Sequence, residues 1–113
     1  MSISTLEQEV LFAALALHPN GYGISIQDHI KQRAGRDRSI ASIYAALGRL
    51  EEKGYVTTRP GEVTHERGGR RKLYVTITAK GQAALQESVR AIWSLKRGLR
   101  WREAFRIGEV FTS

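Results

Sequence analysis

The sequence predicts a mainly α-helical fold with one small β-hairpin, the winged helix-turn-helix arrangement, followed by a long C-terminal helix. Three observations predict it. An amphipathic helix is expected between Ser39 and Gly54, two β-rich stretches joined by a basic tip follow it, and apolar residues recur at helical spacing on both sides of this unit. With 113 residues, the chain fits one compact domain. We assign residues 1–78 to the winged helix-turn-helix and 79–113 to a helical dimerisation segment.

The first helix is expected over Thr5–Leu17. Ser4 and Glu7 have the Ser-x-x-Glu spacing of a capping box, in which each side chain satisfies a free backbone amide of the other residue. Its apolar residues surround most of the helix: Leu6, Val10, Leu11, Phe12, Ala13, Ala14, Leu15 and Leu17. A helix that is apolar nearly all round is usually buried on two sides. In so small a domain, we expect a second subunit to cover one of them.

A second helix is expected over residues 22–33, after a break at residues 18–21 where Pro and Asn-Gly disfavour helical geometry. Ile26 and Ile30 mark its core side. This helix and the next form the helix-turn-helix. The connection at residues 34–38 is longer than the tightest turns, so the crossing angle stays open.

The third helix has the features of a recognition helix. Ser39 is a good N-cap, and Gly54 stands where a helix commonly ends. One face is apolar and is expected to be buried: Ile40, Ile43, Tyr44, Leu47 and Leu50. The other is small and hydrogen-bonding and then positive, which suits a DNA major groove: Ser42, Ala45, Ala46, Arg49 and Lys53. An ordinary helix with a solvated face has the same pattern, so the helix alone does not distinguish a DNA-binding helix from an ordinary one.

The expected hairpin favours a DNA-binding function. Residues 55–58 and 73–77 are rich in β-branched and aromatic residues, as strands are. The loop between them holds two acidic residues, Glu62 and Glu66, against six basic ones: Arg59, His65, Arg67, Arg70, Arg71 and Lys72. Guanidinium groups suit phosphate because they donate two parallel hydrogen bonds. Protection of a sheet edge by charge is the alternative, but that role does not require charges of one sign.

The last expected helix begins at the cap Thr78 and carries a near-heptad apolar seam that needs a partner. We expect self-association through the first and last helices, involving Leu6, Val10, Leu11, Phe12, Leu85, Val89, Ile92, Trp93, Leu95 and Leu99. Trp93 and Trp101 are compatible either with packing or with a cavity for a small aromatic effector at the dimer interface. Residues 101–113 are apolar enough to dock as a short separate helix.

Composition narrows the function classes. The formal charge of +7 and the pI near 10.3 indicate a polyanionic partner, either nucleic acid or an anionic membrane surface. The chain has no cysteine, which excludes disulfides and thiolate chemistry and is compatible with a reducing cytoplasm. The apolar run at residues 10–17 is too short for a signal peptide or a membrane span, so we expect a soluble, cytoplasmic protein.

An enzyme is the least favoured class. His18, His29 and His65 fall in different expected elements, with no spacing typical of metal ligands. No glycine-rich phosphate loop follows a strand, and no acid-base pair stands out. We therefore expect neither a catalytic residue nor a metal or other cofactor.

Several short motifs occur in an order and spacing that together are specific. These are Tyr22-Gly23-Ile24-Ser25-Ile26, Ser42-Ile43-Tyr44-Ala45-Ala46-Leu47, Arg49-Leu50-Glu51-Glu52-Lys53-Gly54-Tyr55-Val56, Gly69-Arg70-Arg71-Lys72-Leu73-Tyr74 and Thr76-Ile77-Thr78-Ala79-Lys80-Gly81. Over about residues 6–95, the chain resembles the PadR family of bacterial transcriptional regulators, in its short branch. Two departures are Ala45, where proline is frequent, and an arginine-rich tail.

The resemblance implies a homodimeric repressor that binds a roughly two-fold symmetric double-stranded DNA operator. It implies that Ser39, Ser42 and Arg49 face the groove and that Tyr44 reaches a backbone phosphate. Tyr22 matches the start of the second helix, and Arg70, Arg71 and Lys72 match the basic wing. Because Tyr44 also lies on the apolar stripe, we expect a buried ring with its hydroxyl at the DNA surface. Charge alone adds Lys53 and Arg67 to the expected DNA-binding residues: Tyr22, Ser39, Ser42, Tyr44, Arg49, Lys53, Arg67, Arg70, Arg71 and Lys72.

A second hypothesis stays open at this point. The basic C-terminal stretch favours a winged-helix module for protein interaction, or an architectural factor that binds DNA without sequence preference. Strong salt dependence without discrimination between operator and random DNA would distinguish this hypothesis from a sequence-specific regulator.

Overall fold

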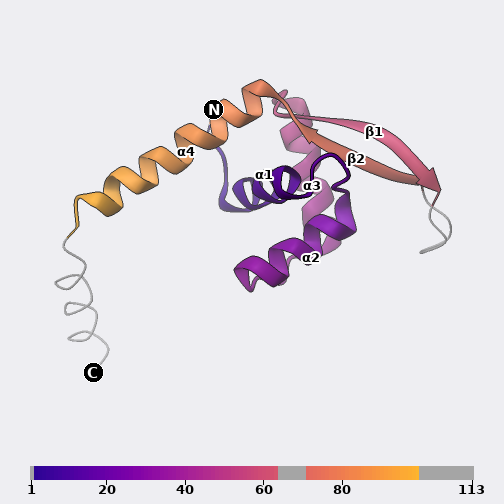
Figure 1. The fold of residues 1–113 in the computed structure, drawn as a ribbon, viewed down its shortest axis with the longest axis horizontal. Coiled ribbons are helices and arrows are strands. Elements are labelled where there is room, and N and C mark those ends of the chain that lie inside the picture. Colours follow the sequence, from indigo (N-terminus) through magenta and orange to yellow (C-terminus); the bar gives the residue numbers. More distant parts are fainter. Residues whose placement is uncertain (1, 64–70, 100–113) are drawn as a thin grey trace.

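The computed structural model describes residues 2–63 and 71–99 and has the element order of a winged helix (Figure 1). The described elements are α1 (Thr5–Leu17), α2 (Gly23–Ala34), α3 (Ile40–Glu52), β1 (Val56–Val63), β2 (Arg71–Ile77) and α4 (Ala79–Arg97). Helices α1, α2 and α3 form the body, and the hairpin and α4 extend from it in opposite directions. The predicted fold class, mainly helical with one small hairpin, is confirmed.

Helix α1 begins at the predicted capping box. The Ser4 hydroxyl accepts a hydrogen bond from the Glu7 amide at 3.1 Å, and the Glu7 carboxylate accepts one from the Ser4 amide at 2.8 Å. These two bonds satisfy amides that the first turn of a helix leaves free. The predicted bounds of this helix are therefore confirmed.

Helices α2 and α3 also begin and end at local signals. The Tyr22 amide donates to the Ser25 hydroxyl at 2.9 Å, and α2 starts at the next residue, Gly23. Ser39 caps α3 by accepting from the Ser42 amide at 3.1 Å, as predicted. The chain leaves α3 through Gly54, whose φ of 78° is a left-handed conformation that favours glycine.

The hairpin is longer than the sequence predicts. β1 and β2 pair antiparallel from Val56 opposite Ile77 to Pro60 opposite Leu73, with an irregularity between Pro60 and Val63. The Val75 amide donates to the Gly21 carbonyl at 2.8 Å. The connection between α1 and α2 is thereby hydrogen-bonded to β2, so the base of the hairpin is attached to the helical body.

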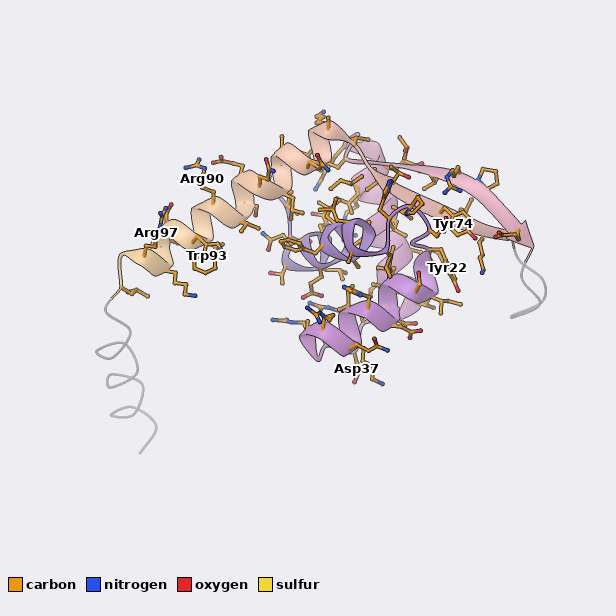
Figure 2. All side chains as sticks on the ribbon, viewed as in Figure 1. Tyr22, Asp37, Tyr74, Arg90, Trp93 and Arg97 are labelled. Carbon is orange, nitrogen blue, oxygen red and sulfur yellow. The ribbon has the colours of Figure 1, made fainter. Side chains whose placement is uncertain are left out.

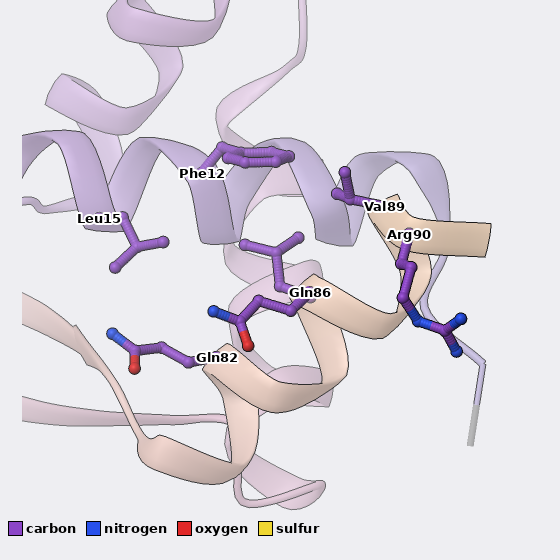
Figure 3. A pocket seen from close by; sticks show the side chains of 7 residues that line it. Phe12, Leu15, Gln82, Gln86, Val89 and Arg90 are labelled. Atoms are coloured by element: carbon purple, nitrogen blue, oxygen red, sulfur yellow. The ribbon is translucent and has the colours of Figure 1, made fainter. Parts of the chain in front are cut away.

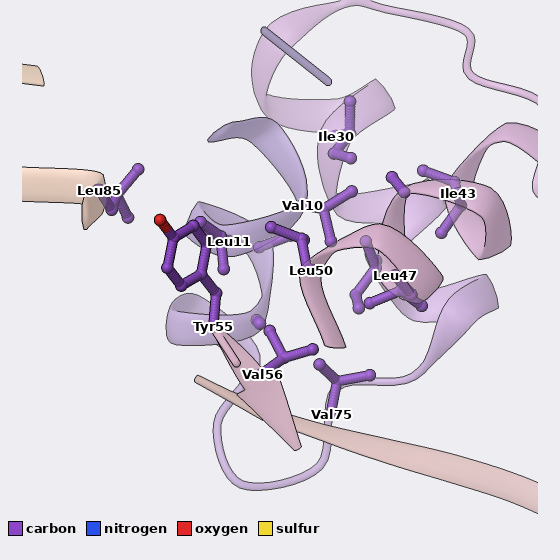
Figure 4. Close-up of a cluster of buried hydrophobic side chains, with 14 residues drawn as sticks. Val10, Leu11, Ile30, Ile43, Leu47, Leu50, Tyr55, Val56, Val75 and Leu85 are labelled. Carbon is purple, nitrogen blue, oxygen red and sulfur yellow. The ribbon is translucent and has the colours of Figure 1, made fainter. Parts of the chain in front are cut away.

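A single apolar core joins the three helices, the base of the hairpin and the start of α4 (Figure 4). Val10 and Leu11 of α1 are fully buried in it, so they cannot present side chains to a second subunit; their expected place at a dimer contact is wrong. Ala46 is fully buried as well, and its expected place on the outer face of α3 is also wrong. The core comprises Val10, Leu11, Ala13, Ala14, Ile26, Ile30, Ile43, Ala46, Leu47, Leu50, Tyr55, Val56, Val75 and Leu85.

Helix α4 leaves the body after its first two turns. Thr78 caps it by accepting from the Gly81 amide at 3.0 Å, as predicted, and Leu85 is its one large residue in the core. Beyond Val89 its apolar residues are exposed. The expected docking of residues 101–113 lies outside the described residues. Within the described residues, no helix combines the length and apolar character needed to cross a membrane.

Candidate nucleic-acid interface

The outer face of α3 is a small, polar surface that starts at the helix N-terminus. Ser39 is exposed and Ser42 is half-buried, and the Ser42 hydroxyl donates to the Ser39 carbonyl at 2.8 Å. Ala45 and Arg49 follow on the same side and are exposed. Small side chains near the N-terminus let the backbone of a helix approach a groove closely. This surface can therefore contact base edges without steric conflict.

Tyr44 is more exposed than the sequence predicts. Its side chain is 50% exposed, so the expected buried ring is wrong. The tip of the ring lies against Gly23: a Cβ atom at position 23 would lie 2.8 Å from the Tyr44 hydroxyl oxygen. Glycine at position 23 leaves room for the phenol in this orientation, directly beside the start of α2. The structure thus brings Tyr44 beside the residue that follows Tyr22.

Arg49 and Lys53 both contact Glu7, which is 2% exposed. The Lys53 ammonium donates to the Glu7 carboxylate at 3.0 Å and to the Ser2 carbonyl at 3.2 Å, and the Arg49 guanidinium lies 3.3 Å from Glu7. Lys53 is therefore turned toward α1 and is 19% exposed, which contradicts its expected place on the outer face. Arg49 is 49% exposed and stays accessible.

Glu7 is ionised despite its burial. Loss of hydration alone would raise the pKa of its carboxyl, but the Ser4 amide, the Lys53 ammonium and the Arg49 guanidinium together outweigh that cost and lower the pKa. A buried carboxylate with these donors is a fixed negative charge next to the C-terminal end of α3. It accounts for the orientation of both basic side chains.

At the base of the wing, Tyr22 and Tyr74 lie close together (Figure 2), and a basic side chain lies over each ring. The rings of Tyr22 and Tyr74 meet edge to face with centroids 6.2 Å apart. The Lys72 ammonium lies 4.6 Å from the Tyr22 ring centroid, and the Arg59 guanidinium lies 4.7 Å from that of Tyr74. Cations over aromatic faces are attracted by the ring quadrupole. The cluster of these four side chains connects the start of α2 to both strands of the wing.

Two further bonds hold this cluster. Arg59 donates to the Pro19 carbonyl at 2.8 Å, and the Tyr74 hydroxyl donates to Glu62. The second bond lowers the pKa of the Glu62 carboxyl and raises the pKa of the Tyr74 phenol. Sequence reasoning missed Tyr74 and the structural role of Arg59, because it read the first as a strand residue and counted the second only as charge. Their alignment across the hairpin register, Arg59 opposite Tyr74, was the signal that could have identified them.

Three expected wing residues are not placed. Arg67 and Arg70 lie outside the described residues, and for Arg71 the structure describes the backbone alone, within β2. Lys72 is placed at the wing base.

A second surface lies between α1 and α4. A groove of about 380 Å³ is lined by Phe12 and Leu15 of α1 and by Gln82, Leu85, Gln86, Val89 and Arg90 of α4 (Figure 3). Phe12, Leu15, Ile92, Trp93, Leu95 and Leu99 are all exposed, whereas Leu6 and Val89 pack partly against the core. Trp93 does not line this groove; its ring lies 4.0 Å from the Lys96 ammonium. Ile92, Trp93 and Leu95 of α4, with Leu99 just beyond its end, make up the exposed apolar strip of α4.

The helical body, the hairpin and the polar face of α3 define a winged helix-turn-helix protein. Residues 11–87 match the family model described as "Transcriptional regulator PadR-like family". The chain therefore belongs to the PadR-like family of transcriptional regulators and is not an enzyme.

Solved structures share the fold. A transcriptional regulator from Clostridium thermocellum is 20% identical, with a TM-score of 0.65 over 98% of this chain and 99% of that one. A Streptococcus mutans protein is 28% identical, with a TM-score of 0.59 over 86% and 85%. Bacillus subtilis PadR, solved in complex with operator DNA, is 23% identical, with a TM-score of 0.61 over 76% of this chain and 48% of that one. No curated protein matches the chain.

Proposed function

We propose that this PadR-like regulator is a homodimeric repressor that binds a roughly two-fold symmetric operator through α3 and the wing. The observation that carries the proposal is the outer face of α3: small and hydrogen-bonding at Ser39 and Ser42, then positive at Arg49. The similarity in fold between this chain and a PadR protein solved with operator DNA supports the same mode of binding. In this mode α3 enters the major groove, and occupation of the operator blocks transcription.

Contacts to the DNA backbone come from the tyrosines and the wing. Tyr44 is half-exposed beside the start of α2, which suits a phenol that donates to a phosphate oxygen. Tyr22 and Lys72 lie together at the wing base, where a phosphate fits against the ammonium. Arg67, Arg70 and Arg71 extend this charge along the wing in the sequence. We leave Lys53 out of the surface because its ammonium is paired with Glu7.

The dimer forms through the exposed strip of α4 together with Phe12 and Leu15 of α1. An apolar strip of this kind on a small chain is stabilised when a second copy covers it. The two-fold axis of such a dimer places two copies of α3 about one helical turn of DNA apart, which matches a two-fold symmetric operator. A small aromatic effector would bind at this interface, where the groove between α1 and α4 offers about 380 Å³ next to Trp93 on the strip.

Binding to the DNA upstream of the protein's own gene tests the proposal. Fluorescence anisotropy compares duplexes that tile that region with scrambled duplexes of equal length, over a series of salt concentrations. We expect Arg49→Ala to weaken operator binding by roughly tenfold and to reduce discrimination, as loss of a base contact does. An Arg70→Ala/Arg71→Ala variant should weaken binding to both kinds of duplex alike and lower the salt slope by about two.

Arg97→Ala is the matched control, since it removes an exposed arginine from the end of α4, which lies away from α3 and outside the groove lining (Figure 2). It should change neither affinity nor discrimination. If Arg49→Ala and the wing variant bind as the wild type does, the assigned surface is wrong. Equal affinity of the wild type for the two kinds of duplex would instead favour an architectural DNA-binding factor.

A further inference from the structure

Helix α1 contacts the chain at both ends of α3: the loop that precedes α3, and the residues at its C-terminal end. It packs against α3 on one side and against α4 on the other (Figure 1). Two acidic residues of its first turns, Glu7 and Glu9, point to opposite ends of α3.

At the N-terminal end, Glu9 binds the loop that leads into α3. Its carboxylate accepts two hydrogen bonds from the Arg38 guanidinium, both at 2.9 Å, and lies 3.2 Å from the Arg36 guanidinium. The Glu9 side chain is 12% exposed, so this pair is largely shielded from water. Gln27 of α2 donates to the Arg38 carbonyl at 2.8 Å. The residue just before the cap Ser39 is thus held from α1 and from α2.

At the C-terminal end, Glu7 binds the last turn of α3 through Arg49 and the capping residue Lys53. A paired guanidinium with two parallel bonds fixes direction as well as distance, and a buried carboxylate fixes the position of its donors. Core residues already pack α3 against α1. The two polar anchors, one at each end, add a restraint on its tilt.

The opposite side of α1 belongs to the proposed dimer surface. Gln8, which lies between the two acidic residues, donates to the Ser88 hydroxyl of α4, and Phe12 and Leu15 line the groove. Alternate residues of the same turn therefore connect to α3 and to α4. Helix α1 therefore links α3 to the proposed dimer surface.

We propose that Glu7 and Glu9 are positioning residues for DNA recognition: the two carboxylates hold the two ends of α3 at a fixed angle to α1, and so set the spacing of the two copies of α3 on an operator. The proposal rests on the proposed function. It assigns a role in specificity to two residues that touch no DNA. Loss of either anchor is expected to impair operator recognition more than binding to random DNA.

A double-mutant cycle on Glu9 and Arg38 tests it. Glu9→Gln, Arg38→Gln and the double variant are compared with the wild type for affinity to operator and to scrambled duplex, as dimers of verified fold and mass. We expect Glu9→Gln to lower the operator-to-random affinity ratio by roughly two- to thirtyfold, the range found for residues that act through a network. Arg38→Gln added to Glu9→Gln should lower the ratio no further, because the pair acts as a unit.

Glu87→Gln is the matched control. It removes the same charge from an exposed Glu–Arg pair, on α4, and should leave the ratio unchanged. Glu7→Gln should act in the same direction as Glu9→Gln; if Glu7→Gln does not fold, the cycle at the more exposed Glu9 still decides. Hydrogen exchange of the free protein adds a readout without DNA: the amides of Ser42 and Ile43, which donate to the Ser39 hydroxyl and carbonyl, should exchange faster in Glu9→Gln.

The outcomes separate the two proposals. If the wild type prefers the operator and the folded Glu9→Gln dimer keeps the same ratio, the positioning role is wrong and the proposed function stands. Fully additive losses from Glu9→Gln and Arg38→Gln would also overturn it, since they would indicate independent effects. If the wild type itself shows no preference, the proposed function fails and this role fails with it.

Discussion

Helices α1 and α4 both carry large apolar residues at helical spacing, but these residues lie in opposite environments in the structure. Val10, Leu11, Ala13 and Ala14 of α1 are buried within the chain itself. On α4, Leu85 is buried, but Leu95 further along is 71% exposed. The cause is position: α1 lies between α3 and α4, whereas α4 extends away from the body after its first two turns.

An excess of apolar residues therefore does not by itself locate an interface. The broad apolar surface of α1 is mostly used by the core of its own chain, and only Phe12 and Leu15 remain for a partner. The outer half of α4 has no cover from the rest of the described chain. The proposed dimer surface therefore lies mainly on α4, and variants on the two helices should have different effects.

The largest effect is expected at Leu11 of α1. Leu11→Ala leaves a cavity in the core and should lower the free energy of unfolding by about 3 kcal/mol. Urea denaturation, followed by circular dichroism, measures it. Leu95→Ala, made on exposed α4 and measured at a dilution where the chain is monomeric, should stay within about 0.5 kcal/mol of wild type. Equal losses from the two variants would show that the helices do not differ as described.

The next effect concerns association. Leu95→Glu should raise the dimer dissociation constant by at least about tenfold, since it places a charge in an apolar interface. Ser94→Glu is the control: its position lies on the side of α4 opposite the exposed apolar strip, and it should leave the dimer intact. Sedimentation velocity over a dilution series distinguishes them. If the dimers of both variants dissociate, or those of neither, the exposed strip of α4 is not the interface.

The smallest expected effect is on the pH dependence of stability, to which Glu7 of α1 contributes. The pKa of Glu7 is lowered in the folded chain, so its ionised form contributes stability above the usual pKa of 4.5, and this contribution is lost as the pH falls through the lowered folded value. Urea midpoints should therefore fall more steeply below pH 4.5 for the wild type than for Glu7→Gln. Glu87→Gln, at an exposed pair on α4, should keep nearly the wild-type midpoint at pH 7. Identical acid profiles for wild type and Glu7→Gln would contradict the role of Glu7.

Local signals in the sequence predicted the elements well. Ser4, Ser39 and Thr78 cap the helices they were expected to cap, because a hydroxyl next to free amides acts over a few residues. Contacts between distant residues were not predictable. Lys53 has the spacing of a groove-facing residue, yet it turns to Glu7, 46 residues away in sequence. Tyr44 was expected to be buried because of its apolar spacing, which cannot reveal a supporting glycine on another helix.

The number of chains bound to one operator tests the central claim most directly. Native mass spectrometry of the protein with the duplex that it binds most tightly upstream of its gene measures this number. We expect two chains per duplex for the wild type, and no such complex on a scrambled duplex of equal length. One chain per duplex, or the same complexes on both duplexes, would contradict a homodimer that reads a two-fold symmetric operator.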